Sequence, residues 1–362
     1  MRGKCIYLAG VVASLYTALA LSSCGTTNHR PPQAIEPIAQ PQHLRLLFTG
    51  DAMCHTPQIT SARSKGDSID FRPSFAGVKR HFDEADIAIV NLETTVSSDS
   101  QYSGYPCFAS PAEYVDALAW LGTDVVVLAN NHCCDKGVEG IRSTIGRLDS
   151  LGIAHTGLFL NEEDYRRNTI LRFERNGIRL SLLNYTYGTN GIPTPKGCIV
   201  NRIDTVQIKS DLQLASNGAD CVVAYIHWGI EYQQQPSSAQ RKLAQFLHRN
   251  GVDIIVGSHP HVVQPYTATD RQITIYSLGN FVSNQRKRYT DGGLLAEIEI
   301  ERGADSICRY SLRTIPTWVM VPGHRIISSE SASEVEMTEA QRAAYNRFID
   351  DTEALLKGGL IF

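Results

Sequence analysis

Five hydrophobic runs in this chain each lead into residues that can bind a metal ion, and they constrain the fold more than any other feature. The runs are rich in β-branched residues and leucine, a pattern that predicts buried strands. Asp, Glu, Asn or His follows in the segments 48–51, 90–93, 129–132, 226–228 and 257–261. The carboxyl ends of parallel strands meet at one edge of a sheet, where open α/β folds place their sites. We therefore expect these side chains to converge.

The converging side chains form a set that is typical of a metal site. Two are carboxylates, one is an amide and three are imidazoles: Asp51, Glu93, Asn131, His227, His259 and His261. Such a mixture suits two divalent ions, with Mn, Fe or Zn favoured over Ca. His259 and His261 flank Pro260, and on an extended backbone two residues at this spacing point to the same side. Ordinary alternatives are a helix cap for Asp51 and a pair of loop histidines.

Six short motifs occur in order between about residues 44 and 300. They are Thr-Gly-Asp-Ala-Met at 49–53, Asn-Leu-Glu-Thr-Thr at 91–95, Ala-Asn-Asn-His at 129–132, His-Trp-Gly-Ile-Glu-Tyr at 227–232, Gly-Ser-His-Pro-His-Val-Val-Gln at 257–264 and Tyr-Ser-Leu-Gly-Asn-Phe-Val at 276–282. Together they resemble the CapA family, the poly-γ-glutamate capsule synthesis proteins, an offshoot of the calcineurin-like metallophosphoesterases. The resemblance implies an α/β fold, the layered α/β/β/α calcineurin-like metallophosphatase sandwich, with two divalent metals (Mn, Fe or Zn).

The resemblance also implies a role for each matching residue. Asp51 would bind one metal, and Glu93 would bridge both metals in place of the more usual aspartate. Asn131 would bind through its carbonyl oxygen. His132 would face the substrate, where it would stabilise charge or protonate a leaving group. A buried structural histidine is the ordinary alternative for His132.

Several positions near the predicted site keep alternative interpretations. Met53 stands where phosphoesterases usually place a histidine. His55, two residues later, either compensates as a ligand, contacts substrate or does neither, and we count it among the catalytic candidates. Asn280 either orients a ligand or is a turn residue. Candidates to line a substrate groove are Trp228, Glu231 and Tyr232.

The first residues predict an export signal with a lipid anchor. Arg2 and Lys4 precede an apolar run at 5–21, and Leu-Ser-Ser-Cys-Gly follows at 21–25. This resembles a bacterial lipobox, with a signal peptide at 1–23 removed and lipid attached to Cys24; an ordinary signal peptide with an incidental cysteine is the alternative. A proline-rich tether at 24–43 would follow. The lipidated Cys24 would hold the protein at the membrane of the bacterial cell envelope, facing the periplasm or the surface.

The remaining chain predicts one domain with an addition at its end. Residues 44–302 alternate strand and helix patterns, with a hairpin turn at Asn176-Gly177. Continuous helices are expected over 72–82 and over 236–250, the second beginning at Pro236. Residues 303–362 would form a C-terminal extension of β and helical structure that packs on the core.

The charge of the chain and the positions of its cysteines limit which ligands and binding partners are expected. The net charge is −3 and no basic stripe occurs, which speaks against nucleic acid. Residues 286–288 read Arg-Lys-Arg, which either attracts a polyanion or is a solvated loop. Seven cysteines remain besides Cys5 and Cys24. Cys133 and Cys134 either ligate metal, bridge to Cys107 or are structural; the spacing favours structural or partly bridged cysteines.

The resemblance implies a role in the synthesis, export or anchoring of poly-γ-glutamate or a related capsule polymer, beside other capsule synthesis subunits. If the protein is an enzyme, it would be a metal-dependent hydrolase acting on an anionic polymer or a phosphoester. Two alternatives stay open at this point. One is an envelope phosphatase or phosphodiesterase, and the other is a non-catalytic polymer-binding assembly subunit.

Overall fold

Two facing β-sheets form the centre of the molecule. The computed structural model describes residues 42–63 and 68–359. The predicted signal peptide, the lipidated Cys24 and nearly all of the tether lie outside these residues. The first sheet contains β1 (Gln42–Ala52), β2 (Ile87–Leu92), β3 (Val125–Val127), β4 (Ala154–Thr156), β13 (Asn280–Val282), β14 (Gly292–Arg302), β15 (Cys308–Met320) and β16 (Arg325–Ser328). Its order is β16-β15-β14-β1-β2-β3-β4, and β13 pairs with β1.

The second sheet is formed by strands from the middle of the chain. It contains β6 (Leu171–Arg175), β7 (Ile178–Thr186), β9 (Cys221–His227), β10 (Ile254–Ser258), β11 (Val263–Ala268) and β12 (Ile273–Leu278) in the order β11-β12-β10-β9-β7-β6. The strands β7, β9, β10 and β12 are parallel. A separate pair consists of β5 (Leu158–Phe159) and β8 (Ile199–Val200).

The two sheets bury a shared apolar core. Phe48, Ile89 and Val127 of the first sheet belong to one hydrophobic cluster with Tyr225 and Val256 of the second. Burying each such side chain stabilises the fold by about 1.5–3 kcal/mol. Because β1, β2 and β3 are parallel, as are β7, β9 and β10, this packing brings two sets of strand ends to neighbouring positions.

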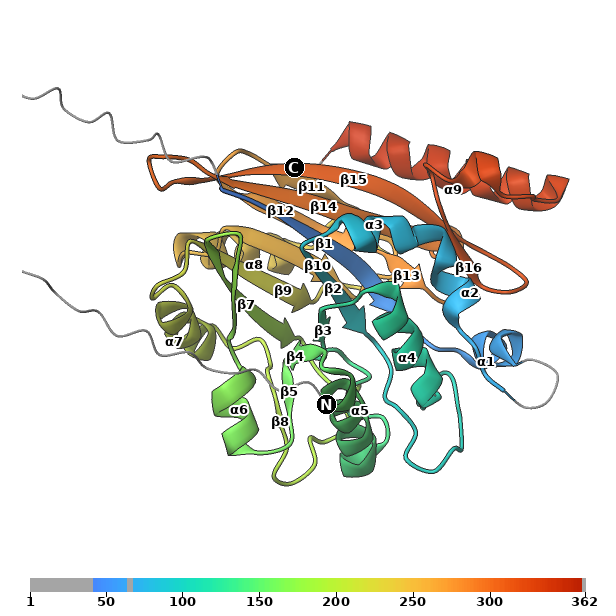
Figure 1. Cartoon of the computed structure of the whole chain (residues 1–362), viewed down its shortest axis with the longest axis horizontal. Coiled ribbons are helices and arrows are strands. Elements are labelled where there is room, and N and C mark those ends of the chain that lie inside the picture. The colour runs from blue at the N-terminus through green and yellow to red at the C-terminus, as the bar shows by residue number, and fades with distance from the viewer. Residues whose placement is uncertain (1–41, 64–67, 360–362) are drawn as a thin grey trace, which may run out of the picture. The chain divides into compact units, whose positions relative to one another are not determined.

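Helices cover the outer faces of both sheets (Figure 1). On the first sheet, one cluster includes side chains from α1 (Thr56–Ala62), α2 (Arg72–Phe75), α3 (Lys79–Glu84), α4 (Ala112–Leu121) and α5 (Gly137–Leu151). On the second, another includes side chains from α7 (Thr205–Ala215) and α8 (Ser238–Arg249). The α/β/β/α layering therefore confirms the predicted fold class. The short α6 (Glu162–Asn168) follows β5.

The last part of the chain extends the first sheet. β15 pairs antiparallel with β14 and with β16. The C-terminal helix α9 (Glu339–Gly358) packs on them through Tyr345 and Phe348, which join Trp318 in a small cluster. A 3-10 turn, η2 (Ala332–Glu334), precedes it. Within the described residues, no helix has the length and apolar character needed to cross a membrane.

Two of the predicted helices differ in the structure. The helix expected over 72–82 is divided by a 3-10 turn, η1 (Ala76–Val78). Gly77 lies against β16 there, where a Cβ atom would sit 2.4 Å from the carbonyl oxygen of Ile326. The helix expected to begin at Pro236 begins at Ser238, because the hydroxyl of Ser237 accepts a hydrogen bond from the amide of Gln240 and caps it.

Candidate metal centre

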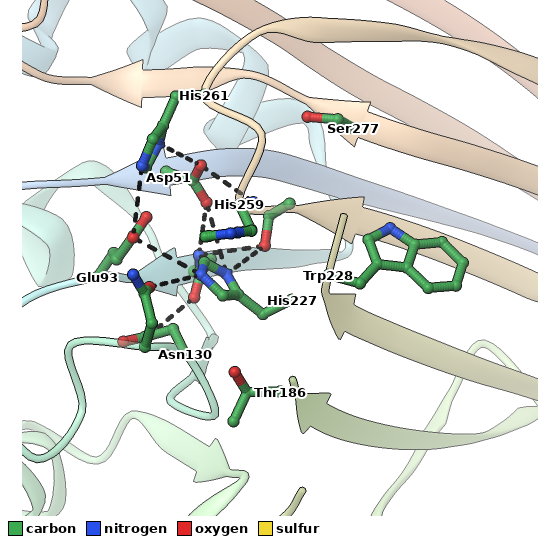
Figure 2. A network of polar contacts seen from close by, with 12 residues as sticks. Asp51, Glu93, Asn130, Thr186, His227, Trp228, His259, His261 and Ser277 are labelled. Carbon is green, nitrogen blue, oxygen red and sulfur yellow. Dashed lines mark hydrogen bonds and ion pairs between the residues drawn. The ribbon is translucent and has the colours of Figure 1, made fainter. Parts of the chain in front are cut away.

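The five predicted carboxylate and imidazole ligands lie together at the edge where the two sheets meet (Figure 2). Asp51 belongs to β1 and Glu93 follows β2, while His227 ends β9. His259 and His261 follow β10. All five are buried, and His259 is the most exposed at 4%. Residues separated by more than two hundred positions in the sequence therefore share one polar site.

Their donor atoms form overlapping groups. Glu93, His227 and His259 make one group, and Glu93, Asp51 and His261 make another; within each, the donor atoms lie within 4.8 Å of one another. Glu93 belongs to both. A third group joins Glu231, an exposed residue, to His259 and His261. Three donors of mixed oxygen and nitrogen type around one point are compatible with a divalent transition metal.

Glu93 is the residue whose environment most needs a cation. Its side chain is fully buried, and neither carboxylate oxygen has a hydrogen-bond partner among the described residues. The nearest imidazole nitrogens, from His227 and His261, are 3.6 and 3.8 Å from its Oε1. Burial, reinforced by the charge of Asp51, raises the pKa of Glu93 well above its usual range. A buried carboxylate without partners is costly, and a bound metal ion would compensate that cost.

His261 is oriented by oxygen atoms on one side of its ring. Its Nδ1 lies 3.0 Å from Oδ2 of Asp51 and 3.1 Å from Oδ1 of Asn280. Since both oxygens are acceptors, Nδ1 carries the proton and Nε2 keeps a free lone pair. Asn280 thus orients a predicted ligand, one of its two expected roles. Its strand β13 reaches β1 because Gly50 allows it: a Cβ there would lie 1.9 Å from the carbonyl oxygen of Gly279.

His227 and Asn131, both predicted ligands, contact each other directly. Nε2 of His227 is 2.8 Å from Oδ1 of Asn131, and its Nδ1 is 2.9 Å from the hydroxyl of Ser258. The amide nitrogen of Asn131 donates to Oδ1 of Asn190 at 3.2 Å, which turns the carbonyl oxygen of Asn131 toward His227. The two predicted donor atoms therefore lie close enough together to be compatible with binding one metal ion.

The protonation states favour metal binding. Burial lowers the pKa of His259 to about 3, with a further contribution from His261. Burial likewise lowers the pKa of His227 well below its usual range. Burial alone would raise the pKa of Asp51, but the hydrogen bond from His261 holds it below its usual range. Neutral imidazoles and an ionised carboxylate are the forms that bind metals.

The extended backbone predicted for His-Pro-His is wrong. His259 has φ 97° and His261 has φ 57°, a region that side chains other than glycine rarely adopt. The bend between β10 and β11 turns the amide of His259 toward Oδ2 of Asp51, at 3.3 Å. The carbonyl of Pro260 accepts from the amide of Tyr232, which itself has φ 66°. These tertiary contacts hold a strained conformation, and such strain is concentrated at functional sites.

His132 is held by a carboxylate that the sequence analysis missed. Its Nδ1 is 2.8 Å from Oδ2 of Asp135, which also accepts a hydrogen bond from the amide of Phe108. The ring of Phe108 contacts the His132 ring edge-on at 4.7 Å. The other nitrogen, Nε2, lies 3.5 Å from the amide nitrogen of Asn190. The Asp135 carboxylate fixes the orientation of the His132 ring, and a role for His132 as a general acid stays a prediction.

Comparison with known families identifies the chain. Residues 45–285 match the family model described as "Bacterial capsule synthesis protein PGA_cap". The protein belongs to this family of capsule synthesis proteins. The matched span contains all five buried carboxylate and imidazole donors as well as His132 and Asp135. The resemblance to the CapA family is thereby confirmed.

Named relatives of this capsule synthesis protein occur in Bacillus. The "Capsule biosynthesis protein CapA" of Bacillus anthracis is 28% identical over 311 residues, which cover 82% of this chain and 74% of that protein. The "PGA biosynthesis protein CapA" of Bacillus subtilis is 29% identical over 273 residues, covering 72% and 68%. Among solved structures, a phosphatase from Mycoplasma pneumoniae aligns with a TM-score of 0.48 and 15% identity, covering 76% of this chain and 94% of that one.

In this capsule synthesis protein, His55 lies outside the donor groups found among the described residues. It precedes α1, and its Nδ1 lies 3.2 Å from the amide of Asn284. Its ring contacts Phe108 at 5.1 Å, so Phe108 touches both His55 and His132. Burial lowers the pKa of His55 to about 4. A catalytic role for His55 stays a prediction.

An apolar cavity adjoins the donor cluster. It has a volume of about 630 Å³, and its walls include Tyr187, Trp228, Leu243 and Phe246. The ring of Tyr187 also packs on His259 at 4.4 Å between ring centres, so the cavity and the cluster share a wall. Trp228, a predicted groove residue, donates from its ring nitrogen to the carbonyl of Tyr276. Nothing in the local sequence distinguishes Tyr187 from a core tyrosine.

The cysteines near the site remain thiols. All seven described cysteines are free. Cys133 and Cys134 have their sulfur atoms 3.8 Å apart, and Cys107 donates to the carbonyl of Asp135. No described cysteine belongs to a group of possible metal donors, and Cys107 forms no disulfide bond. The metal-ligand and disulfide alternatives are therefore not seen. The structural alternative describes them.

Further residues support the cluster through contacts that only the tertiary structure makes. The amide nitrogen of Asn91 donates to Oδ1 of Asp51 at 2.8 Å. The amide nitrogen of Asn130 donates to the carbonyl of Leu92. The spacing of Asp135 three residues after His132 is the one sequence clue that was available, since such a spacing within a turn allows a side-chain contact.

Proposed function

We propose that this protein binds two divalent metal ions at the Asp51–Glu93–histidine cluster and uses them to hydrolyse an anionic substrate during capsule polymer synthesis, export or anchoring. Poly-γ-glutamate or a related polymer is the proposed substrate, because relatives carry names that refer to capsule and PGA biosynthesis. The observation that carries the proposal is the Glu93 carboxylate. It is fully buried and shared by two donor groups, and neither of its oxygens has a hydrogen-bond partner among the described residues.

Each ion would have its own ligands, with Glu93 shared. Asp51 and His261 would hold one ion, and His227, His259 and the carbonyl oxygen of Asn131 would hold the other. This set of oxygen and nitrogen donors fits Mn, Fe or Zn. When bound, two such ions would activate an electrophile and a water molecule.

The chain's own residues would position the substrate and transfer protons. His132, held at Nδ1 by Asp135, would donate the Nε2 proton to the leaving group. The Asp135 carboxylate would stabilise the imidazolium form that makes this possible. Asn190, which contacts both Asn131 and His132, would keep these two side chains in a fixed relative orientation.

We further propose that the protein acts from the bacterial cell envelope. The Leu-Ser-Ser-Cys-Gly segment at 21–25 supports lipid attachment at Cys24 after removal of residues 1–23. A tether ending near residue 43 would connect the lipid to the domain at 44–302, with 303–362 as its C-terminal extension. From this position the protein would reach an exported polymer together with other capsule synthesis subunits.

Metal content tests the proposal directly. The full chain, solubilised in mild detergent, would be analysed by elemental mass spectrometry beside a His259→Ala/His261→Ala variant. His43→Ala, which removes an exposed histidine from β1, serves as the control. About two transition-metal ions per chain in the parent and the control, with fewer in the double variant, would support the site. Absence of metal after supply of Mn²⁺ or Zn²⁺ would contradict it.

Substrate assays then separate the hydrolytic possibilities. Shortening of poly-γ-glutamate by the metal-loaded parent, lost in Asp51→Ala, would support polymer hydrolysis. Turnover of a simple phosphoester without any effect on the polymer would identify a phosphatase or phosphodiesterase instead. Polymer binding without hydrolysis, unaffected by His259→Ala, would indicate a non-catalytic assembly subunit.

A further inference from the structure

The basic triplet at 286–288 does not act as one surface patch. Arg286 donates to the carbonyl oxygens of Val319 and Ser283 at 3.3 and 3.2 Å. Arg288 donates to both carboxylate oxygens of Asp351 on α9, at 2.8 and 3.1 Å. Lys287 pairs with no carboxylate of the described residues; its ammonium lies 4.0 Å from the ring centre of Tyr232. The three neighbouring cations thus have three different environments.

Lys287 connects a basic pocket with the donor cluster. The ring of Tyr232, beneath the Lys287 ammonium, is 6.2 Å from the ring of His261. Lys287 also lines a pocket of about 260 Å³ between its loop and α9. A polyanionic chain with one anionic group at His261 would therefore have the Lys287 ammonium next to it, and the pocket against α9 could hold the following part of the chain.

The pocket carries an excess of positive charge. Its walls contain four cationic and two acidic side chains, namely Arg286, Lys287, Arg288, Arg347, Asp291 and Asp351. Both acids are already engaged, Asp351 by Arg288 and Asp291 by the ring nitrogen of Trp318 at 2.8 Å. Arg347 forms no ion pair within the described part of the chain. In a protein of net charge −3, such an excess indicates an anion-binding site.

We propose that Lys287 and Arg347 form a subsite for a carboxylate of a polycarboxylate chain, next to the unit that occupies the metal centre. The proposal rests on the proposed function, because it supplies that site with a second contact to its substrate. The guanidinium of Arg347 can bind a carboxylate through two parallel hydrogen bonds, while Lys287 acts as a point charge.

The two cations of the subsite would offset the negative charge of the metal-free donor cluster. In the metal-free protein, the carboxylates of Asp51 and Glu231 lie close to the histidines and would repel an anionic chain. Cations at the entrance would offset this repulsion and hold the chain across the site. A small uncharged substrate would gain nothing from them, so the subsite would select for length and charge.

Polymer binding to metal-free protein tests the subsite independently of catalysis. The probe is fluorescently labelled poly-γ-glutamate, followed by anisotropy with chelator-treated full chain in mild detergent. We expect Lys287→Ala/Arg347→Ala to bind at least about tenfold more weakly than the parent, a loss of about 1.4 kcal/mol. The single variant Lys287→Arg, which keeps the charge at that position, should retain most of the affinity. Circular dichroism and thermal unfolding would confirm that each variant is folded.

A control of equal charge decides whether position or net charge matters. Lys209→Ala/Arg249→Ala removes two exposed cations from α7 and α8 and should bind the polymer like the parent. Equal weakening by both double variants would overturn the proposal, as would a parent that does not bind the polymer. Tighter binding of inorganic polyphosphate through the same two side chains would overturn the polycarboxylate assignment. Because no metal is present, none of these outcomes depends on whether the metal proposal succeeds.

Discussion

The hydroxyl of Tyr225 donates a hydrogen bond to the main-chain carbonyl of Thr49 at 2.8 Å, and so ties β9 of one sheet to β1 of the other. Each residue lies two positions before a predicted metal ligand, His227 and Asp51. Both Tyr225 and Thr49 are fully buried, so water cannot replace the bond. It therefore sets the distance between the ligands that the two sheets contribute.

Loss of this bond should loosen the metal centre. Tyr225→Phe removes one hydroxyl, and we expect the free energy of unfolding to fall by about 1–2 kcal/mol, because a buried carbonyl loses its partner. Metal affinity should fall as well. Urea unfolding and Mn²⁺ titration would measure both, with Tyr266→Phe on β11 as the control. Unchanged metal affinity would show that the sheet spacing does not depend on this contact.

The unpartnered carboxylate of Glu93 should destabilise the metal-free protein. Glu93→Gln replaces a carboxyl group whose charged form burial disfavours, so at a pH where Glu93 is ionised the chelator-treated variant should be more stable than the chelator-treated parent, by about 1–3 kcal/mol. The same variant should lose metal. Urea unfolding and elemental analysis test the two effects, and Glu174→Gln on the exposed face of β6 should change neither. A less stable metal-free variant would contradict this account of Glu93.

Stability should depend on pH through His324, which lies outside the donor cluster. Its nitrogens contact Ser61 and Asn284, and burial, followed by the charges of Arg286 and His55, lowers its pKa to about 4. An unfolded histidine binds a proton near pH 6.5, so between about pH 6.5 and 4 the unfolded state holds more protons. Stability should therefore fall as the pH falls through this window.

Replacement of that side chain provides the measurement. Urea unfolding of chelator-treated protein between about pH 4.5 and 7.5 should show a pH slope smaller by up to one proton in His324→Asn than in the parent. His43→Asn controls for the removal of an imidazole elsewhere on the protein. An identical slope in His324→Asn and the parent would exclude His324 as the origin of the effect.

The His132–Asp135 pair should affect turnover without affecting the metals. We expect His132→Gln to lower kcat by about 10²–10⁴-fold, since proton transfer to the leaving group is lost. Asp135→Asn should act in the same direction by removing the charge that stabilises the imidazolium. Metal content should stay at the parent level in both. Loss of metal together with activity would mean that His132 is a ligand instead.

The alternation of strand and helix, and the position of the ligands after strands, could be predicted because both are local. Hydrophobic periodicity shows where a strand is buried, and the parallel arrangement brings the strand ends to one edge. For this reason Asp51, Glu93 and the three histidines were found from the sequence. Their metal-binding roles remain predictions.

The details that complete the site come from contacts between distant segments. Tyr187 and Asn190, in the loop after β7, and Ser258, the last residue of β10, contact the ligands, and no local pattern distinguishes them. The divided helix at Gly77 follows from contact with β16.

The sequence by itself determined the alternation of strands and helices and the kinds of donor that gather at one sheet edge, because periodicity and residue chemistry are properties of short segments; the layered arrangement was implied by the resemblance to the CapA family. Only the tertiary structure decided that the His-Pro-His segment is strained, and that Lys287 faces Tyr232 while Arg288 pairs with α9. A positive φ is maintained by contacts made after the chain has folded, and the partner of a charged side chain depends on which segments the fold brings within reach.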